Sequence, residues 1–388
     1  MKVAFTGGGT AGHAMVNKVL IPLLHEDEYK IIYIGSYNGA EKAMIENQGI
    51  ADYYGISTGK LRRYFSWDNV KDLFKVLKGV FQAYRILRKE MPNVLFSGGG
   101  FVSVPVIIAA HFLKIPILIR ETDFSIGLAN RICIPFAQKV FVTFPDTKLK
   151  VNTVPCDYCG LIIRPELLDT KHSATKSERP TVLVMGGSLG SQSINQVIWN
   201  NADNLLCRYN ILHICGKGKI NRQLQSNEKY RQYEYVEDMA DLYSRADVII
   251  TRCGSNAISE GLALGKPMVC IPLPSRSSRG EQKQNALYAV QNGCATIIEE
   301  NELCYETLVT AIEEVLKKPI NPKLVLNKER LMCNCRKLIT EIKSQAMKNL
   351  EERFIKLIEK GRSIDYNSLS EWEFKVFLEL DDQHGKSF

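Results

Sequence analysis

Residues 2–13 have the sequence KVAFTGGGTAGH, in which a short β-type run leads through a glycine loop into a helical pattern. A glycine loop in this setting is typical of parallel α/β domains, where it makes the tight turn from strand to helix. The same order returns at Thr181–Met185, which is followed by Gly186-Gly187-Ser188-Leu189-Gly190 and a helical pattern from Ser191. The chain therefore opens twice in the same way, which predicts two doubly wound α/β domains with parallel sheets.

Short apolar runs alternate with helix-length segments in both halves, as parallel strands joined by crossover helices require. A polar run, Asp169–Pro180, separates the halves and has the composition of a linker. We expect domains at 1–165 and 178–335, followed by a charged helix and an acidic tail at 336–388. The expected strands are Lys2–Thr6, Lys30–Ile34, Asn93–Phe96, Ile117–Arg120, Lys139–Val142, Thr181–Met185, Asn210–Cys215, Val248–Thr251 and Met268–Ile271.

The composition is that of an ordinary globular chain, with 388 residues, 45% of them hydrophobic and 24% charged. No run of about 18 apolar residues occurs, so we expect no membrane-spanning helix. The N-terminus lacks the apolar core of a signal peptide, which indicates the cytoplasm. Eleven cysteines, an odd number, fit reduced thiols. A zinc site made by Cys156, Cys159, Cys333 and Cys335 and a Cys156/Cys159 redox pair are less favoured alternatives.

Gly7-Gly8-Gly9-Thr10-Ala11-Gly12 matches the G-x-G-x-x-G pattern of dinucleotide-binding loops. Glycines there let backbone N–H groups approach a phosphate at the N-terminus of the helix. Dinucleotide binding also requires an acidic residue that binds the ribose at the end of the second strand. Ile34-Gly35-Ser36, which ends that strand here, contains none. This disfavours an NAD(P)-dependent oxidoreductase. The alternative is that the glycines serve only a tight turn.

Three further segments suit a ligand that carries phosphate. Gly98-Gly99-Gly100 and Gly186–Gly190 both follow expected strands, and open α/β sheets bind ligands at the carboxyl ends of their strands. The third, Thr251–Glu260, is a strand end, a turn and a helix start, where Ser255 or Asn256 can cap the helix. Glu260 lies about one turn further on and can reach a ribose; a solvated helix residue is the alternative.

Taken in order, these motifs resemble the MurG family of glycosyltransferases, which add N-acetylglucosamine to a lipid-linked muramyl peptide in bacterial cell-wall synthesis. The resemblance runs from Lys2 to about Lys317. Its landmarks are Gly8–His13, Gly99–Pro105, Gly127–Asn130, Gly186–Ser191, Arg252 with Gly254-Ser255 and Glu260, and finally Gln282 and Asn285.

The resemblance implies the GT-B arrangement, in which two facing Rossmann-like domains hold the UDP-sugar mainly through the C-terminal one, and it implies no cofactor. Within the family pattern, Glu260 would contact the ribose, the backbone of Val236 the uracil, and Gln282 the sugar hydroxyls. The implied donor-binding residues are Thr10, Ala11, Gly12, Asp123, Arg164, Ser188, Val236, Gly254, Ser255, Asn256, Glu260 and Gln282.

Four positions depart from the family pattern, and all lie on the N-terminal or junction side. Arg120-Glu121 replaces a His-Glu pair, and Asp123 stands where many relatives have Asn. Ala14-Met15-Val16 lacks a proline, and Cys156–Gly160 is unlike the usual approach to Arg164. The residue pattern therefore supports the identity of the donor better than the identity of the acceptor. The alternatives are a related transferase for another lipid or secondary metabolite, and a non-catalytic UDP-sugar-binding protein.

An inverting transferase needs a base for the acceptor hydroxyl and a site for the charge of the leaving diphosphate. His13 is the expected base because imidazole titrates near neutral pH, and Glu121 is the reserve. Backbone N–H groups at Ser188 and Gly254–Asn256 would meet the leaving-group charge. No aspartate cluster indicates a required metal.

Residues 60–90 hold nine basic and three acidic side chains, most of the net charge of +8. Apolar residues recur there at helical spacing, and we expect them to form core: Val70, Leu73, Phe74, Leu77, Val80, Phe81, Tyr84 and Leu87. Just before them, aromatic side chains lie among cations, a combination that suits an anionic membrane surface. The expected patch is Arg62, Arg63, Phe65, Trp67 and Lys71. No motif supports nucleic-acid binding.

Overall fold

The computed structural model describes residues 1–59, 67–169, 178–187, 189–274, 280–318 and 322–359, together with 373, 376–378 and 380. The chain divides into two compact units. The first contains Met1–Thr122, Ile126–Gly160 and Asn334–Phe388, and the second contains Asp123–Ser125 and Leu161–Cys333. Apart from the short segment Asp123–Ser125, the chain therefore leaves the first unit after Gly160 and returns to it at Asn334.

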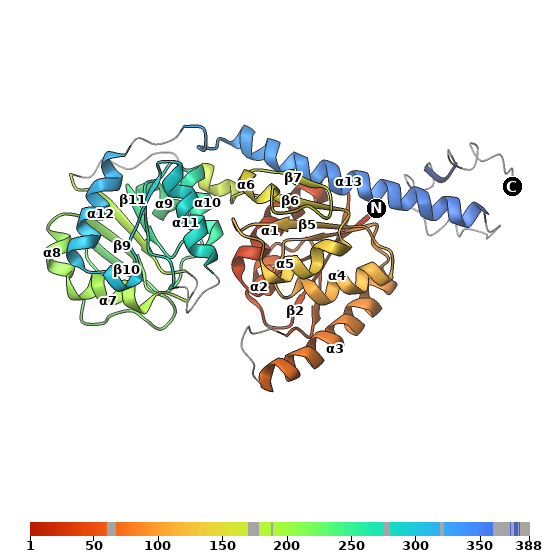
Figure 1. Cartoon of the computed structure of the whole chain (residues 1–388), viewed down its shortest axis with the longest axis horizontal. Coiled ribbons are helices and arrows are strands. Elements are labelled where there is room, and N and C mark those ends of the chain that lie inside the picture. Colours follow the sequence, from red (N-terminus) through yellow and green to blue (C-terminus); the bar gives the residue numbers. More distant parts are fainter. Residues whose placement is uncertain are drawn as a thin grey trace. The chain divides into compact units, whose positions relative to one another are not determined.

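The first unit is built on a seven-stranded sheet in the order β3-β2-β1-β4-β5-β6-β7, with every neighbouring pair parallel (Figure 1). Its strands are β1 (Lys2–Thr6), β2 (Lys30–Ser36), β3 (Asp52–Ile56), β4 (Val94–Ser97), β5 (Ile117–Glu121), β6 (Lys139–Val142) and β7 (Cys156–Tyr158). Its helices are α1 (Ala11–Glu26), α2 (Ala40–Glu46), α3 (Trp67–Glu90), α4 (Ser103–Phe112), α5 (Leu128–Cys133) and α6 (Pro145–Lys148), with a 3-10 turn η1 (Ile134–Phe136).

The second unit has a six-stranded parallel sheet in the order β10-β9-β8-β11-β12-β13. Its strands are β8 (Thr181–Met185), β9 (Asn210–Ile214), β10 (Tyr230–Tyr233), β11 (Val248–Thr251), β12 (Met268–Cys270) and β13 (Ala295–Ile297). Its helices are α7 (Gln192–Asn200), α8 (Ala202–Leu206), α9 (Ala240–Arg245), α10 (Ser255–Ala263), α11 (Glu281–Gln291) and α12 (Tyr305–Lys317), with 3-10 turns η2 (Pro165–Leu168) and η3 (Glu300–Glu302).

The long helix α13 (Lys328–Glu359) begins in the second unit and packs on the first. Lys139 at the start of β6 forms an ion pair with Glu341 at 2.8 Å, and Lys343 pairs with Asp27 at 2.7 Å. The two parallel sheets and this helix confirm the expected fold class of two parallel α/β domains with a helical C-terminal extension. No helix in the described ranges is long and apolar enough to span a bilayer.

Both sheets reverse their strand order at one place, between β1 and β4 and between β8 and β11. At such a switch point the loops after the two strands diverge to opposite faces of the sheet and leave room for a ligand. The glycine loops of the sequence lie at these two places, since Gly7–Gly12 follows β1, Gly98–Gly100 follows β4, and Gly186–Gly190 follows β8.

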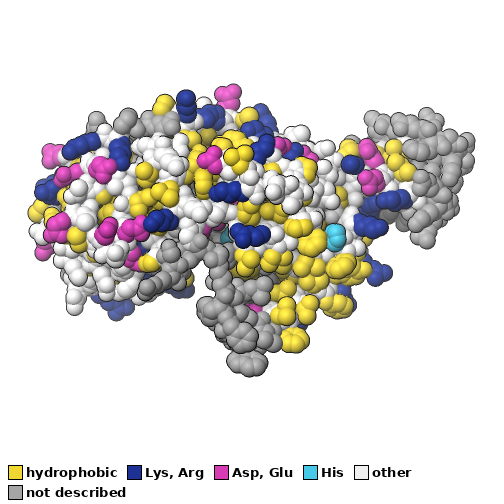
Figure 2. Space-filling view, in the orientation of Figure 1, with side chains coloured by type: hydrophobic (Ala, Val, Ile, Leu, Met, Phe, Trp, Pro, Cys, Tyr) yellow, Lys and Arg dark blue, Asp and Glu magenta, His cyan; other side chains and the backbone are white. Residues whose placement is uncertain are grey.

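The expectation that the apolar residues of α3 form core is wrong for half of them. Leu73, Phe74, Leu77 and Phe81 are each more than half exposed, whereas the buried face of α3 is formed by Val76, Ala83 and Leu87, with Val80 and Tyr84 packed against the core. The helix has two apolar rows at helical spacing, and only one can face the sheet. Figure 2 shows apolar side chains along the outer edge of the first unit, where α3 and α4 lie.

A fully buried histidine makes the second unit sensitive to acid. His213 in β9 contacts the Tyr230 hydroxyl at 3.1 Å and the Asn195 side-chain oxygen at 3.0 Å, and burial lowers its pKa to about 3. In the unfolded chain the pKa is about 6.5, so between these values the unfolded state binds the proton and the folded state does not. Stability is therefore full above about pH 6.5 and falls as the pH drops toward 3.

We expect the free energy of unfolding to decrease by up to about 1.4 kcal/mol per pH unit below pH 6 on account of His213. Urea unfolding of wild type and His213→Gln at pH 7.5, 6 and 5 measures this, because glutamine keeps hydrogen-bonding capacity but does not titrate. The gap in stability between the two proteins should shrink as the pH falls. A constant gap would contradict a neutral buried His213.

Candidate functional site

In the second unit, two loops flank the switch point between the neighbouring strands β8 and β11. The loop Gly186–Gly190 leads into α7, and the turn Arg252–Gly254 leads into α10. A methyl group added to Gly187, which has φ +83°, or to Gly254 would meet no described atom within 4 Å. Both glycines are also exposed, so a ligand can approach the backbone closely here, as a phosphate site requires. Ser188 lies outside the described residues.

The start of α10 differs from the expectation in one detail. Gly254, with φ −60° and ψ 147°, is the N-cap, and no side chain caps the helix, so the expected cap by Ser255 or Asn256 is wrong. Both residues already belong to the first turn, where their side chains cannot reach back as a cap does. Among the described residues, no side chain caps these first N–H groups of α10, and the helix dipole favours an anion there.

The turn before α10 is under strain. Cys253 has φ +62°, a left-handed conformation that costs a non-glycine residue about 1–2 kcal/mol. Its side chain is fully buried, and Asn285 of α11 donates from Nδ2 to its carbonyl oxygen at 3.2 Å. Strained backbone of this kind concentrates at ligand-binding sites, where the surrounding packing holds it in place.

Arg252 braces the same turn, a role that the sequence did not suggest. It is buried, and its Nε donates to the Ser191 hydroxyl at 2.9 Å, while Nη2 donates to the Ser193 hydroxyl at 2.6 Å and pairs with Glu300. Ser191 is the N-cap of α7 and accepts a hydrogen bond from the N–H of Ile194. Arg252 thereby ties the helix that follows the Gly186–Gly190 loop to the end of β11.

Glu260 is not a solvated helix residue, because only 5% of it is exposed. Its Oε1 accepts hydrogen bonds from Arg164 Nε at 3.1 Å and Nη2 at 3.0 Å, and its Oε2 accepts one from the Tyr243 hydroxyl at 2.7 Å. Burial acts to lower the pKa of Arg164, but the Glu260 carboxylate outweighs it, so the pKa is raised. Two of the residues expected at the donor, 96 positions apart in the chain, thus lie together.

Three further expected donor residues of this unit come from other segments of the chain. Val236 is half-buried in the loop between β10 and α9. Gln282 in the first turn of α11 accepts a hydrogen bond at Oε1 from the N–H of Leu273 at 2.9 Å. Asp123 accepts one at 3.0 Å from Asn285, which also bonds the N–H of Phe124. Asn285 therefore joins the segment 123–125 to the strained turn at Cys253.

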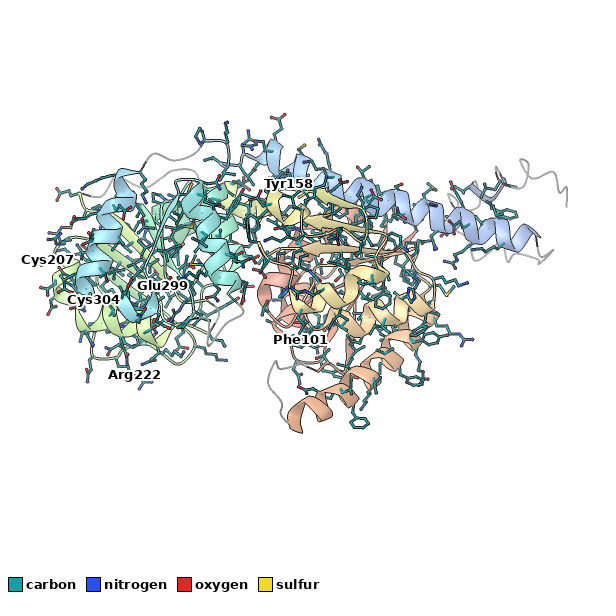
Figure 3. All side chains as sticks on the ribbon, viewed as in Figure 1. Phe101, Tyr158, Cys207, Arg222, Glu299 and Cys304 are labelled. Atoms are coloured by element: carbon teal, nitrogen blue, oxygen red, sulfur yellow. The ribbon has the colours of Figure 1, made fainter. Side chains whose placement is uncertain are left out.

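In the first unit, His13 lies in the first turn of α1 over the second glycine loop. Its Nδ1 is 2.8 Å from the Thr10 hydroxyl. A methyl group on Gly100 would lie 3.1 Å from the His13 ring, and one on Gly99 would lie 3.3 Å from it and 3.1 Å from the Asn130 amide. Phe101, labelled in Figure 3, packs so closely on Gly9 that any side chain there would clash with its ring. Glycine is needed here for this packing.

The first glycine loop already holds an anion of the chain itself. Glu41 of α2 is fully buried, and its carboxylate accepts hydrogen bonds from the N–H of Gly9 at 3.2 Å and from the N–H of Ser36 at 3.0 Å. A methyl group on Gly8 would lie 2.5 Å from the carboxyl carbon. The Glu41 carboxylate thus binds a backbone N–H of the loop that a dinucleotide phosphate would need. This agrees with the earlier argument, from the missing ribose carboxylate, that the loop does not bind a dinucleotide.

Arg120 and Glu121 are adjacent in β5, so their side chains point to opposite faces of the sheet. Glu121 is buried, and its Oε2 accepts hydrogen bonds from the N–H of Gly127 and from the Asn130 side chain, both at 2.9 Å. Arg120 is buried beside the thiol of Cys159, and its Nε has no hydrogen-bond partner among the described atoms. Burial raises the pKa of Cys159, and the guanidinium opposes that rise.

Several expected residues cannot be placed. Arg62, Arg63 and Phe65 lie outside the described residues, as does most of the acidic tail, and the side chains of Ala11, Trp67 and Lys71 are not described. Within the described ranges, no group of three or more His, Cys, Asp or Glu side chains is arranged to hold a metal ion, and all eleven cysteines are free thiols.

Two family models match the chain, the glycosyltransferase family 28 N-terminal domain at residues 3–142 and the C-terminal domain at residues 181–354. A Geobacillus thermodenitrificans protein, described as UDP-N-acetylglucosamine--N-acetylmuramyl-(pentapeptide) pyrophosphoryl-undecaprenol N-acetylglucosamine transferase, is 46% identical over 346 residues, covering 87% of this chain and 94% of that protein. A Clostridium botulinum protein with the same description is 46% identical over 315 residues, covering 79% and 89%.

Among solved structures, the crystal structure of Acinetobacter baumannii MurG superposes with a TM-score of 0.64 at 22% identity, covering 88% of this chain and 99% of that one. At 22% identity, this structural similarity supports the fold alone. The sequence relatives, by contrast, match the chain across both units.

Proposed function

The chain belongs to the MurG family of glycosyltransferases, and we propose that it transfers N-acetylglucosamine from UDP-N-acetylglucosamine to the muramyl sugar of a lipid-linked peptidoglycan precursor. The observation that supports this most strongly is the 46% identity to curated transferases of that description over nearly their whole length. The second unit adds physical support, because Arg164 and Glu260, both expected at the donor, form an ion pair there, and exposed glycine backbone flanks the switch point of the sheet.

In this proposal the second unit binds the donor. The diphosphate lies on the open backbone at Gly187, Gly254 and the first turn of α10, where glycine and a free helix N-terminus favour an anion. Glu260 accepts hydrogen bonds from the ribose hydroxyls, and Arg164 beside it supplies a permanent positive charge. The same N–H groups stabilise the charge that grows on UDP as it leaves.

The reaction is a single displacement with inversion. The acceptor hydroxyl attacks the anomeric carbon, the bond from that carbon to the diphosphate oxygen breaks, and the hydroxyl proton passes to His13. The Thr10 hydroxyl supports this role, since by accepting from Nδ1–H of His13 it favours the tautomer in which Nε2 carries no proton and can accept one. Glu121 is less suited, because one of its oxygens already holds two N–H groups. We assign Glu121 to positioning Asn130 and the start of α5.

The test of this proposal is UDP release by the full chain with UDP-N-acetylglucosamine and lipid-linked muramyl pentapeptide. UDP should accumulate only when both substrates are present. Release without acceptor would indicate hydrolysis, and donor binding without release would indicate a UDP-sugar-binding protein.

We further propose that the enzyme docks on the anionic inner face of the cell membrane through the first unit, where a lipid-linked acceptor is concentrated. The exposed row Leu73, Phe74, Leu77 and Phe81 on α3 supports this, together with Phe112 of α4, which is 69% exposed. Arg85 lies 5.8 Å from the Phe81 ring, and further cations follow on the same helix. Apolar side chains among cations suit the surface of an anionic bilayer.

Replacing Phe74 and Phe81 with aspartate should strongly reduce sedimentation with vesicles that contain phosphatidylglycerol, because it removes apolar burial and adds charge that the lipid repels. Turnover of a water-soluble acceptor analogue should persist. Leu149→Asp is the matched control, since Leu149 is exposed on the same unit outside this row. Equal sedimentation of the double variant and the control would contradict docking through α3.

A further inference from the structure

One tyrosine hydroxyl connects two segments of the proposed donor site. Tyr243 of α9 is almost fully buried, and its hydroxyl donates to Glu260 Oε2 on α10 at 2.7 Å. The same oxygen lies 3.8 Å from the sulfur of Met185, the last residue of β8 before the Gly186–Gly190 loop. The Tyr243 hydroxyl therefore binds the proposed ribose carboxylate and packs against the end of the strand that leads to the proposed phosphate loop.

The hydroxyl is a permanent donor. Burial and then the nearby carboxylate of Glu260 raise the pKa of Tyr243 well above its ordinary value, so the phenol stays protonated at any physiological pH. A hydrogen bond from such a donor to a carboxylate is strong, and it fixes the orientation of the carboxylate group and of its remaining lone pairs.

Glu260 needs that restraint. The terminal torsion of a glutamate is broad, so a carboxylate held at one oxygen alone can turn about its axis. Arg164 holds Oε1 through two N–H groups, and Tyr243 holds Oε2. Each oxygen can accept more than one hydrogen bond, so Oε2 keeps room for a ribose hydroxyl while Tyr243 stays in place.

We propose that Tyr243 is a positioning residue for donor recognition, which orients Glu260 toward the ribose and makes the site select ribonucleoside over 2′-deoxyribonucleoside diphosphates. The inference rests on the proposed function, because it takes the ligand of Glu260 to be the ribose of a UDP-sugar. The inference goes beyond the proposed function by naming Tyr243 as the residue that orients Glu260, so that the site distinguishes ribose from 2′-deoxyribose in the bound nucleotide.

The experiment compares binding of UDP and of 2′-deoxyuridine 5′-diphosphate by calorimetry in wild type, Tyr243→Phe and Tyr230→Phe, all as the full chain. Tyr230 is the matched control, because it is equally buried in the same unit and its hydroxyl contacts His213 instead. Wild type should prefer UDP by about tenfold or more, the effect of a hydrogen bond to a charged group. Tyr243→Phe should lose most of this preference by weakening UDP binding alone, and Tyr230→Phe should keep it.

A second variant covers the case in which Tyr243→Phe is poorly folded. In a Glu260→Gln background, Tyr243→Phe should add little further loss of UDP affinity, since both act on one hydrogen bond. Equal weakening of both ligands by Tyr243→Phe, or additive losses in the double variant, would overturn the inference in favour of a purely structural tyrosine. Wild type that binds both nucleotides equally would overturn it too. Wild type that binds neither would overturn the proposed function, and the inference with it.

Discussion

His13→Ala should lower turnover by about a hundredfold or more, because the loss of a general base typically costs two to four orders of magnitude. The affinity for UDP should stay nearly unchanged, since the proposed diphosphate and ribose contacts come from the second unit. The measurements are steady-state turnover and UDP calorimetry on the same preparation. His25→Ala is the matched control, because His25 is exposed in the last turn of the same helix.

The outcome also separates the two candidate bases. If His13→Ala keeps its activity while Glu121→Gln abolishes it, the base assignment is wrong and Glu121 takes the proton. Loss of activity in both is the expected result, because Glu121 holds Asn130 and the N–H of Gly127, and Asn130 lies against the loop beneath His13. In that case Glu121→Gln should leave the pH dependence of the remaining activity as it is in wild type.

Glu260→Ala should weaken UDP binding by about 1.5–3 kcal/mol, the value of a hydrogen bond to a charged group, or roughly 10- to 150-fold. It should also lower stability, because Arg164 would keep its charge in a place where only 12% of its side chain is exposed after losing its ion-pair partner. Glu260→Gln should cost less stability, since an amide oxygen can still accept from Arg164.

The control is Glu313→Ala, which removes an exposed ion pair with Arg208 in the same unit. Exposed pairs contribute about 0–1 kcal/mol, and we expect no change in UDP affinity. A folded Glu260→Ala protein with unchanged UDP affinity would remove Glu260 from the donor site.

The inner strands of both sheets could be predicted from the sequence because they are continuous apolar runs, which buried parallel strands require. The four strands that no pattern indicated are the edge strands of the two sheets. They are β3 with Gly55 among tyrosines, the three-residue β7, the polar β10 and the three-residue β13. Edge strands are half solvated and short, so their sequences need no apolar run. Tertiary pairing alone makes them strands.

The two apolar rows of α3 show a second limit. Both have helical spacing, and nothing local decides which of them meets the sheet. The positions of the glycine loops could be predicted from their spacing, but the side chain that binds the first loop could not. The sequence lacks a carboxylate at the end of β2, but Glu41 five residues later folds back onto Ser36 and Gly9.

At the proposed donor site, the sequence could not predict which residues far apart in the chain contact one another. Arg164 and Glu260 could be assigned to the donor through the family resemblance, although their mutual ion pair could not. Tyr243 belongs to no motif that the sequence showed. Arg252 does belong to one, but its contacts with Ser191 and Ser193 appear only when β8, β11 and the helices after them pack together.

The most direct test of the central claim is the mass and anomeric configuration of the lipid product. The full chain is incubated with UDP-N-acetylglucosamine and lipid-linked muramyl pentapeptide, and the lipid fraction is examined by mass spectrometry and proton NMR. We predict a gain of one N-acetylhexosamine residue per acceptor, joined through a β linkage formed from the α-linked donor. An unchanged acceptor with UDP-N-acetylglucosamine bound to the protein, or an α-linked product, would contradict the account.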